Sequence, residues 1–199
     1  MTPKSKLILA SSSPRRAEIL RNAGFDFAVV PAHVDETRRP NEHPADYVRR
    51  LAEDKAHTVA RQLAKDAASD STLIIGADTA VVIDSEILCK PSSAANAREM
   101  LRRLNGKTHE VYTGLTLLQG NGTVHTAVEK TRVTFEPLSE GEIEGYIATG
   151  EPFDKAGAYA IQGRGGKFIS HIEGCYFNVM GLPLARLYAM LRGLSGEHR

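Results

Sequence analysis

The sequence has little of several features that place a protein in a class at once. Its 199 residues include two cysteines, Cys89 and Cys175, which are far apart and form no CxxC pair. This usage argues against a disulfide scaffold and favours a reducing compartment. No apolar run approaches membrane-spanning length, and residues 7–10 are too short for the core of a signal peptide. We therefore expect a soluble, cytoplasmic protein that does not bind membranes.

Excess charge and familiar catalytic motifs are also missing. The chain has 25 lysines and arginines against 24 aspartates and glutamates, a formal net charge of +1. This balance gives no global field for a nucleic acid polymer, so any anion site has to be local. The patterns GxxxxGK[ST], GxGxxG, GxSxG and HExxH are absent, and the seven histidines form no ligand-spaced pair. A zinc site, a serine nucleophile and a classical phosphate loop are therefore disfavoured.

The most apolar stretch, residues 72–84 (TLIIGADTAVVID), is rich in β-branched residues and predicts a buried central strand. Asp78 interrupts it, and burying a lone carboxylate costs on the order of several kcal/mol unless a cation or donor meets it. Gly76 beside it permits a kink or a close backbone approach. Two interpretations stay open: a β-bulge whose aspartate caps a loop, or a carboxylate that points into a cleft.

A second polar group follows the first predicted strand, residues 6–10. Ser13 is a good N-cap and Pro14 suits the first helical position, so a helix should begin here and end before Gly24. Arg15 and Arg16 fall in its first turn, where cations oppose the helix dipole. Their presence makes sense if a phosphate binds at this helix end, whereas the alternative is two solvated surface arginines.

A long helix is predicted over residues 44–65, with an apolar stripe at Val48, Leu51, Ala52, Ala56, Val59 and Leu63. Lys55 falls on that stripe, where it either extends out to solvent or meets a buried partner such as Asp78. Glu36 lies in the loop that follows a predicted strand, residues 25–31. Lys90 ends a short predicted strand just before Pro91.

The rest of the chain reads mainly as scaffold for one domain. Its predicted elements are a helix from Ser92 or Ser93 through Arg103, a hairpin of residues 110–118 and 123–135, a helix opened by the capping box Ser139–Glu142, a strand at 168–172 and a helix at 181–191. The length of the chain allows one domain, or two lobes around a cleft.

The last third carries a polar, glycine-rich segment, residues 151–166. Its glycines allow backbone to approach a ligand closely, and Gln162 can donate and accept at once, which suits the edge of a base. A plain glycine-rich surface loop is the alternative. Basic and acidic residues of the chain together fit a polyphosphate held by cations, with carboxylates left for a divalent metal or for water: Arg15, Arg16, Lys55, Lys90, Glu36, Asp78 and Asp154.

Six segments together resemble the Maf family of nucleotide pyrophosphatases. They are SSSPRR, VDE before a lysine-bearing helix, GADT, CKP, EPFDKAGAYAIQG and GLPL, in the family's order and over nearly the whole chain. The resemblance implies one domain over residues 1–199, of the α/β class, with an extended mixed β-sheet bent around a deep cleft and flanked by helices. This is a two-lobed fold like that of inosine triphosphate pyrophosphatases, often found as a homodimer.

The resemblance also implies hydrolysis of a nucleoside triphosphate to the monophosphate and diphosphate, with a divalent metal, usually Mg²⁺, with Mn²⁺ as the alternative. Asp78 matches the family's proton acceptor, and Glu36 matches a carboxylate near the metal and water, so both are predicted metal ligands. The family's phosphate-side basic residues are matched by Arg15, Arg16, Lys55 and Lys90.

Three positions resemble the branch of the family that acts on dTTP and UTP. In the branch that acts on 7-methyl-GTP, tryptophan replaces Arg15, glutamine replaces Thr79 and glutamate replaces Gln162. A neutral amide can pair with O4 and N3–H of uracil or thymine, whereas glutamate suits a cationic methylated guanine. The alternatives are a 7-methyl-GTP pyrophosphatase and a nucleotide-binding regulator of cell division that does not turn its ligand over.

Overall fold

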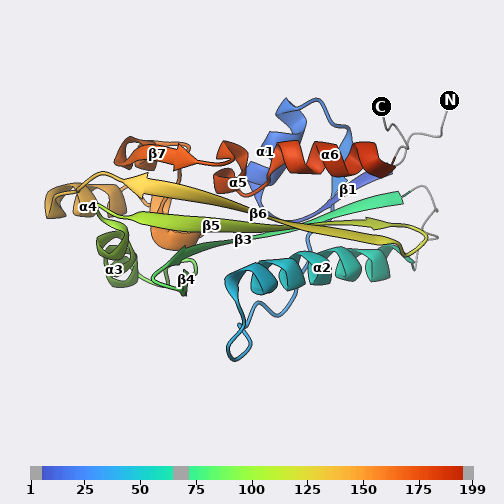
Figure 1. The fold of residues 1–199 in the computed structure, drawn as a ribbon, viewed down its shortest axis with the longest axis horizontal. Coiled ribbons are helices and arrows are strands. Elements are labelled where there is room, and N and C mark those ends of the chain that lie inside the picture. The colour runs from blue at the N-terminus through green and yellow to red at the C-terminus, as the bar shows by residue number, and fades with distance from the viewer. Residues whose placement is uncertain (1–5, 65–71, 195–199) are drawn as a thin grey trace. The chain divides into compact units, whose positions relative to one another are not determined.

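The structure, a computed structural model, describes residues 6–64 and 72–194, whose strands form one mixed sheet of seven (Figure 1). They are β1 (Lys6–Ala10), β2 (Phe27–Val29), β3 (Thr72–Ile83), β4 (Glu86–Leu88), β5 (Thr108–Gln119), β6 (Val124–Phe135) and β7 (Ile169–Glu173). The order is β2-β1-β3-β5-β6-β7, with β4 on β3. β1 pairs in parallel with β2 and β3, whereas β3–β4 and β6–β7 are antiparallel.

Helices flank this sheet, which confirms the predicted α/β class. They are α1 (Pro14–Asn22), α2 (Pro44–Leu63), α3 (Ala94–Leu104), α4 (Glu140–Ile147), α5 (Tyr176–Met180) and α6 (Leu184–Leu194), with short 3₁₀ turns η2 (Glu151–Asp154), η3 (Ala156–Ala158) and η4 (Arg164–Phe168). No helix within the described ranges is long and apolar enough to cross a membrane.

The chain divides into two compact units, each built from separate segments. Unit 1 comprises residues 1–78, 113–129 and 181–199, and unit 2 comprises residues 79–112 and 130–180. The strands β3, β5 and β6 each contribute residues to both units. The deep cleft implied by the resemblance stays a prediction.

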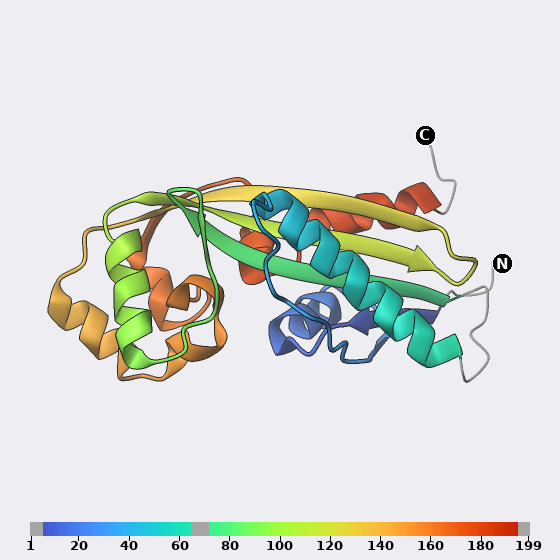
Figure 2. The ribbon, with the colours of Figure 1, turned by 90° about the horizontal axis from the view of Figure 1, so that it is seen from below.

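In unit 1, α2 and α6 lie on opposite faces of the sheet, α2 in front of the strands and α6 behind them in Figure 2. Most of the predicted stripe of α2 is buried, with Val48, Leu51, Ala52, Ala56 and Val59 fully covered, while Leu63 at the end of the helix is half-buried. Two strand glycines let the helix approach closely. A Cβ on Gly76 would lie 2.0 Å from the carbonyl oxygen of Ala52, and one on Gly114 2.1 Å from that of Val48. The close backbone approach that was one prediction at Gly76 is therefore the contact of β3 with α2.

Unit 2 has its own core, formed by β3–β6 residues together with α3, α4 and the 3₁₀ turns. The imidazole of His109 packs edge-on against the rings of Phe135 and Tyr159, at centroid distances of 5.2 and 5.3 Å. The capping box of α4 is present, since the Ser139 hydroxyl accepts from Glu142 N and the Glu142 carboxylate accepts from Ser139 N.

Several predicted boundaries move. The strand expected at residues 25–31 shortens to β2, and β4 ends at Leu88, so Lys90 follows a strand rather than ending one. The last helix begins at Leu184 instead of 181, because the first bond of its ladder joins Leu187 N to Pro183 O. The predicted end of the long helix at residue 65 lies outside the described residues. Helix α5 and the 3₁₀ turns were not predicted.

Candidate active site

The buried charge of β3 has the partner that it needs. The Asp78 side chain is buried, and its Oδ1 lies 2.5 Å from the ammonium nitrogen of Lys55, which projects from the buried stripe of α2. Glu36 Oε1 lies 2.7 Å from the same nitrogen, on a carboxylate that is half exposed. The β-bulge interpretation of Asp78 is not needed, because the two residues that looked costly in the sequence form an ion pair with each other.

Arg16 is a second buried cation of this site. Its Nε donates to the carbonyl oxygen of Gly181 at 2.7 Å, and its Nη1 donates to the Ser11 hydroxyl at 3.0 Å. These neutral acceptors orient the guanidinium without neutralising it. The surface alternative is wrong for Arg16, which is 8% exposed, whereas its neighbour Arg15 is half-buried.

The local structure of α1 explains this placement. The helix begins at Pro14 after Ser13, as predicted, but the Ser13 side chain makes no capping hydrogen bond. Ser11 instead accepts from the Ser13 amide at 3.2 Å as well as from Arg16. Sequence reasoning missed Ser11 and Gly181 as supports of this arginine, because one acts through a small hydroxyl and the other through its main chain.

Burial dominates the titration of the site. It raises the pKa of Asp78 above its ordinary value, against the opposing pull of Lys55 and Arg16. It lowers the pKa of Arg16, although the charge of Asp78 opposes this change. A carboxylate with a raised pKa, held beside cations, has the character of a proton acceptor.

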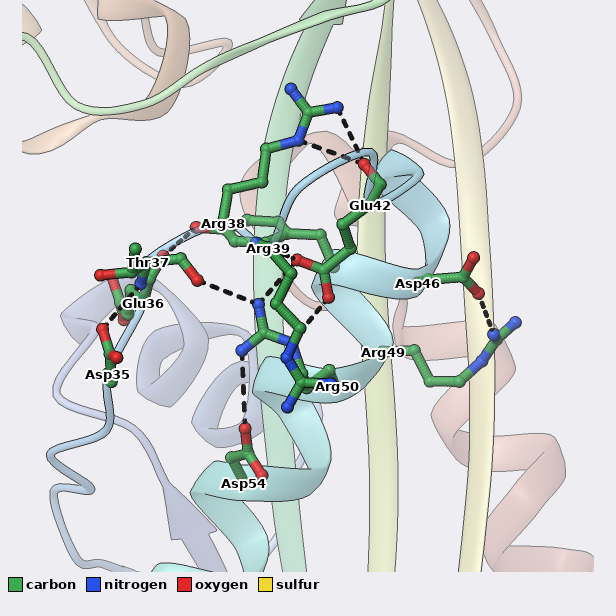
Figure 3. Close-up of polar contacts among 11 residues, drawn as sticks. Asp35, Glu36, Thr37, Arg38, Arg39, Glu42, Asp46, Arg49, Arg50 and Asp54 are labelled. Atoms are coloured by element: carbon green, nitrogen blue, oxygen red, sulfur yellow. Dashed lines mark hydrogen bonds and ion pairs between the residues drawn. The ribbon is translucent and has the colours of Figure 1, made fainter.

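The loop that carries Glu36 is tied to α2 (Figure 3). The hydroxyl of Tyr47 donates to Glu36 O at 3.0 Å, and Arg50 donates to Thr37 O at 3.2 Å. Arg50 also makes two bonds to the Glu42 carboxylate, at 2.6 and 2.8 Å, which lower the pKa of Glu42 to about 2. The helix that supplies the buried lysine therefore also fixes the backbone beside the second carboxylate. Apart from the charges themselves, nothing in the sequence indicates these supports.

The remaining predicted residues belong to unit 2. Thr79 follows Asp78 in β3 and is half-buried, while Lys90 and Gln162 are exposed. Lys90 lies two residues beyond β4, and Gln162 lies in the turn between η3 and η4. That these three residues share one pocket with Asp78 stays a prediction. Asp154, from the wider polar set, pairs with Lys155 at 2.5 Å.

The two carboxylates of the site are oxygen donors, the ligand type that Mg²⁺ takes. Glu36 and Asp78 each place one oxygen on the ammonium nitrogen of Lys55, and Mg²⁺ is usually held by one or two carboxylates plus substrate phosphates and water. Across residues 6–64 and 72–194 there is no group of three His, Cys, Asp or Glu side chains that could hold a metal ion by itself.

The fold and the site define a mixed α/β protein with a buried lysine–aspartate pair on which a second carboxylate converges. The model of the Maf family, whose description is Maf-like protein, matches residues 6–194 of this chain. The chain therefore belongs to this family.

Relatives and one solved structure can be compared with it. The dTTP/UTP pyrophosphatase of Koribacter versatilis (strain Ellin345) is 51% identical over 186 residues, or 94% of this chain and 93% of that protein. The dTTP/UTP pyrophosphatase of Bacillus cytotoxicus is 51% identical over 187 residues, or 94% of each chain. The Staphylococcus aureus Ham1 protein aligns with 94% of this chain and 98% of its own at 15% identity and a TM-score of 0.49.

Proposed function

We propose that the protein is a nucleoside triphosphate pyrophosphatase that hydrolyses dTTP and UTP to the monophosphate and diphosphate. Relatives that share half of its residues over nearly their full length carry this activity in their names, which supports the proposal. The observation that carries it is the buried Asp78 carboxylate, paired with Lys55 at 2.5 Å and faced by Glu36 across the same nitrogen. A binding protein that does not turn over its ligand has no use for such a base.

Each residue has a role in this reaction. Arg15, Arg16 and the first turn of α1, with Lys55 and Lys90, hold the triphosphate and offset its developing charge. Asp78 accepts a proton as water attacks the α-phosphorus. The new phosphorus–oxygen bond forms as the bond to the bridging oxygen breaks, and diphosphate leaves.

Magnesium is the proposed cofactor, with Mn²⁺ as the alternative, and Glu36 and Asp78 would hold it. The metal supplies charge neutralisation at the phosphate oxygens when it is bound. Because Asp78 is both the proposed proton acceptor and a proposed metal ligand, its removal should weaken proton transfer and metal binding, whereas removal of Glu36 should weaken metal binding first. A comparison of the Mg²⁺ dependence of Glu36→Gln and Asp78→Asn separates the two roles.

Base selectivity is proposed to rest on Arg15, Thr79 and Gln162. The Gln162 amide can donate to O4 and accept from N3–H of uracil or thymine, so a base with the opposite pattern leaves polar groups unpaired. The test is diphosphate release from dTTP, UTP, CTP, GTP, 7-methyl-GTP and ATP in Mg²⁺. We expect the highest kcat/KM for dTTP and UTP.

The same panel tests the alternatives. A preference for 7-methyl-GTP would reassign the chain to the other branch of the family, and binding without diphosphate release would indicate a regulator. A homodimer and a cytoplasmic location are further proposals from the resemblance. Sedimentation of the purified chain tests the first of these.

A further inference from the structure

Gln162 lies in a turn that closes on other residues of unit 2. Gly163 has a φ of +110°, and a Cβ there would lie 2.8 Å from Oε2 of Glu151. A Cβ on Gly165 would lie 2.7 Å from both the carbonyl oxygen of Ala160 and the hydroxyl of Tyr146. Protein neighbours are therefore enough to require glycine at these two positions, and the predicted close approach of a ligand to this segment stays a prediction.

Two side chains bind the turn on both sides of Gln162. The Glu151 carboxylate accepts from the amides of Arg164 and Gly165, at 3.0 and 3.1 Å. The Tyr146 hydroxyl accepts from the Ala160 amide at 3.1 Å and donates to Glu151 at 2.9 Å. The backbone two residues before Gln162 and the backbone two residues after it are thus joined through one tyrosine–glutamate pair, which we call the clamp.

The clamp is built as a rigid support. Tyr146 is 3% exposed, and burial together with the bond to Glu151 raises the pKa of its hydroxyl. Burial pushes the pKa of Glu151 up, but the two backbone amides and Tyr146 outweigh it, so the pKa is lowered and the carboxylate stays charged. Lys155 donates to the carbonyl oxygen of Glu151 at 2.8 Å and fixes its backbone. None of the residues that make these hydrogen bonds has a role in the proposed reaction.

We propose that Tyr146 and Glu151 are positioning residues for base selectivity, because they fix the turn from which Gln162 reads the pyrimidine edge. The inference rests on the proposed function. An amide distinguishes uracil from cytosine by the direction of its donor and acceptor, since cytosine presents an amine and a bare ring nitrogen where uracil presents O4 and N3–H. A side chain on a loose turn can rotate to satisfy both patterns, whereas a fixed turn leaves one pattern unpaired.

The test compares binding of UMP and CMP, two nucleoside monophosphates that differ only at this edge, by calorimetry. The variants are Glu151→Gln, which places an amide NH₂ opposite backbone donors, and Tyr146→Phe, which leaves the Ala160 amide without its acceptor. We expect each to reduce the preference for UMP over CMP by about 10-fold, with the affinity for inorganic diphosphate unchanged. Faster hydrogen exchange at the amides of Arg164 and Gly165 should accompany the loss.

Matched controls are Glu144→Gln and Tyr112→Phe, which remove a carboxylate and a hydroxyl of unit 2 that lie outside the clamp. In the wild type, Gln162→Ala should lower the UMP preference, and in Glu151→Gln it should have no further effect. Additive losses, or an unchanged preference in both clamp variants, would overturn the inference. If Glu151→Gln fails to fold, Tyr146→Phe decides. Absence of pyrimidine triphosphate hydrolysis by the wild type is a separate result, which overturns the proposed function.

Discussion

At the scale of single residues, the site depends on charges that are costly alone and tolerable together. Lys55 and Asp78 are each less than a tenth exposed, and they lie 2.5 Å apart. Removal of Lys55 leaves the buried Asp78 carboxylate without its ammonium partner, while removal of both leaves neither charge of the pair. Stability and activity should therefore respond differently to single and double substitutions.

We expect Lys55→Met to lower the free energy of unfolding by about 3 kcal/mol at neutral pH. Without Lys55, the pKa of Asp78 in the folded chain should rise further above its ordinary value of 3.8. Such a carboxyl costs no stability below pH 3.8 and costs more as the pH rises above that value, so the loss should grow with rising pH. The double variant Lys55→Met/Asp78→Asn should recover most of this stability. Turnover should fall by on the order of 10²-fold or more in Asp78→Asn and in the double variant. Urea unfolding beside a diphosphate assay measures both.

The exposed pair Arg49–Asp46, at 2.6 Å on the same helix, provides the control. Arg49→Met and Asp46→Asn should each change stability by less than about 1 kcal/mol and leave turnover unchanged. Equal stability of Lys55→Met and the double variant would show that Asp78 does not depend on Lys55 for its charge.

His109 is expected to make stability fall in mild acid. Its ring is 1% exposed, its Nε2 lies 2.7 Å from the Tyr159 hydroxyl, and its Nδ1 has no hydrogen-bond partner among the described residues. Burial lowers its pKa from 6.5 to about 4. Below pH 6.5 the unfolded chain therefore binds a proton at this histidine, whereas the folded chain binds it only near pH 4. The stability that the neutral ring contributes is lost as the pH falls from 6.5 to about 4.

Denaturant unfolding at pH 7, 5.5 and 4.5 measures this effect. The wild type should lose on the order of 2 kcal/mol more than His109→Gln over this range, which follows from the size of the pKa change and from a lowest pH still above the lowered pKa. His125→Gln, at an exposed position, is the control variant. Parallel pH curves for the wild type and His109→Gln would contradict the expectation.

At the scale of elements, the sequence predicted what depends on local chemistry and missed what depends on neighbours. Caps and apolar stripes identified α1, α2 and α4, and the interruption of β3 drew attention to Asp78. The 3₁₀ turns η3 and η4 and the helix α5 are short. They depend on contacts with residues distant in the sequence, such as the hydrogen bond that the Asn178 side chain of α5 donates to Val111 O at 3.0 Å. The glycines near Gln162 signalled close approach, but a sequence cannot say whether a ligand or another side chain approaches.

The close contact between α2 and β3 gives a prediction at this scale. Gly76→Ala would drive a methyl group into the Ala52 carbonyl oxygen, so the helix has to move away from the strand. Lys55 stands on this helix and Asp78 on this strand, so their ion pair should lengthen as the helix moves. We expect a loss of about 3 kcal/mol or more in stability, near the upper end for overpacking, and lower turnover in the folded fraction.

Gly141→Ala is the matched control, since beyond its chain neighbours and the backbone of its own helix no atom lies within 4 Å of a Cβ at this position of α4. That change should raise stability by about 0.5–1 kcal/mol, because alanine favours a helix. Thermal melting of the two variants checks the contrast. Wild-type stability and activity in Gly76→Ala would show that the helix does not depend on this contact.

At the scale of the whole molecule, the two units are not separate pieces of chain. Unit 1 is made of three segments and unit 2 of two. Three strands are divided between them, β3 after Asp78, β5 after Tyr112 and β6 after Glu129. We expect that a strand which unfolds in one unit weakens its own hydrogen bonds in the other unit, because the same strand continues there. If the chain is one domain, as its length predicts, the two units should unfold cooperatively.

We expect the protein to unfold in a single transition, with the calorimetric enthalpy equal to the van't Hoff enthalpy. Destabilising substitutions in either unit should then lower one common midpoint. Gly76→Ala in unit 1 and Tyr146→Phe in unit 2 supply the pair, and hydrogen exchange of β1 and α3 amides reports each unit separately. If Gly76→Ala lowers protection in β1 while α3 keeps wild-type protection near the midpoint, the units unfold independently and the one-domain prediction is wrong. If both lose protection together, the shared strands couple the half that carries Asp78 and Lys55 to the half that carries Gln162.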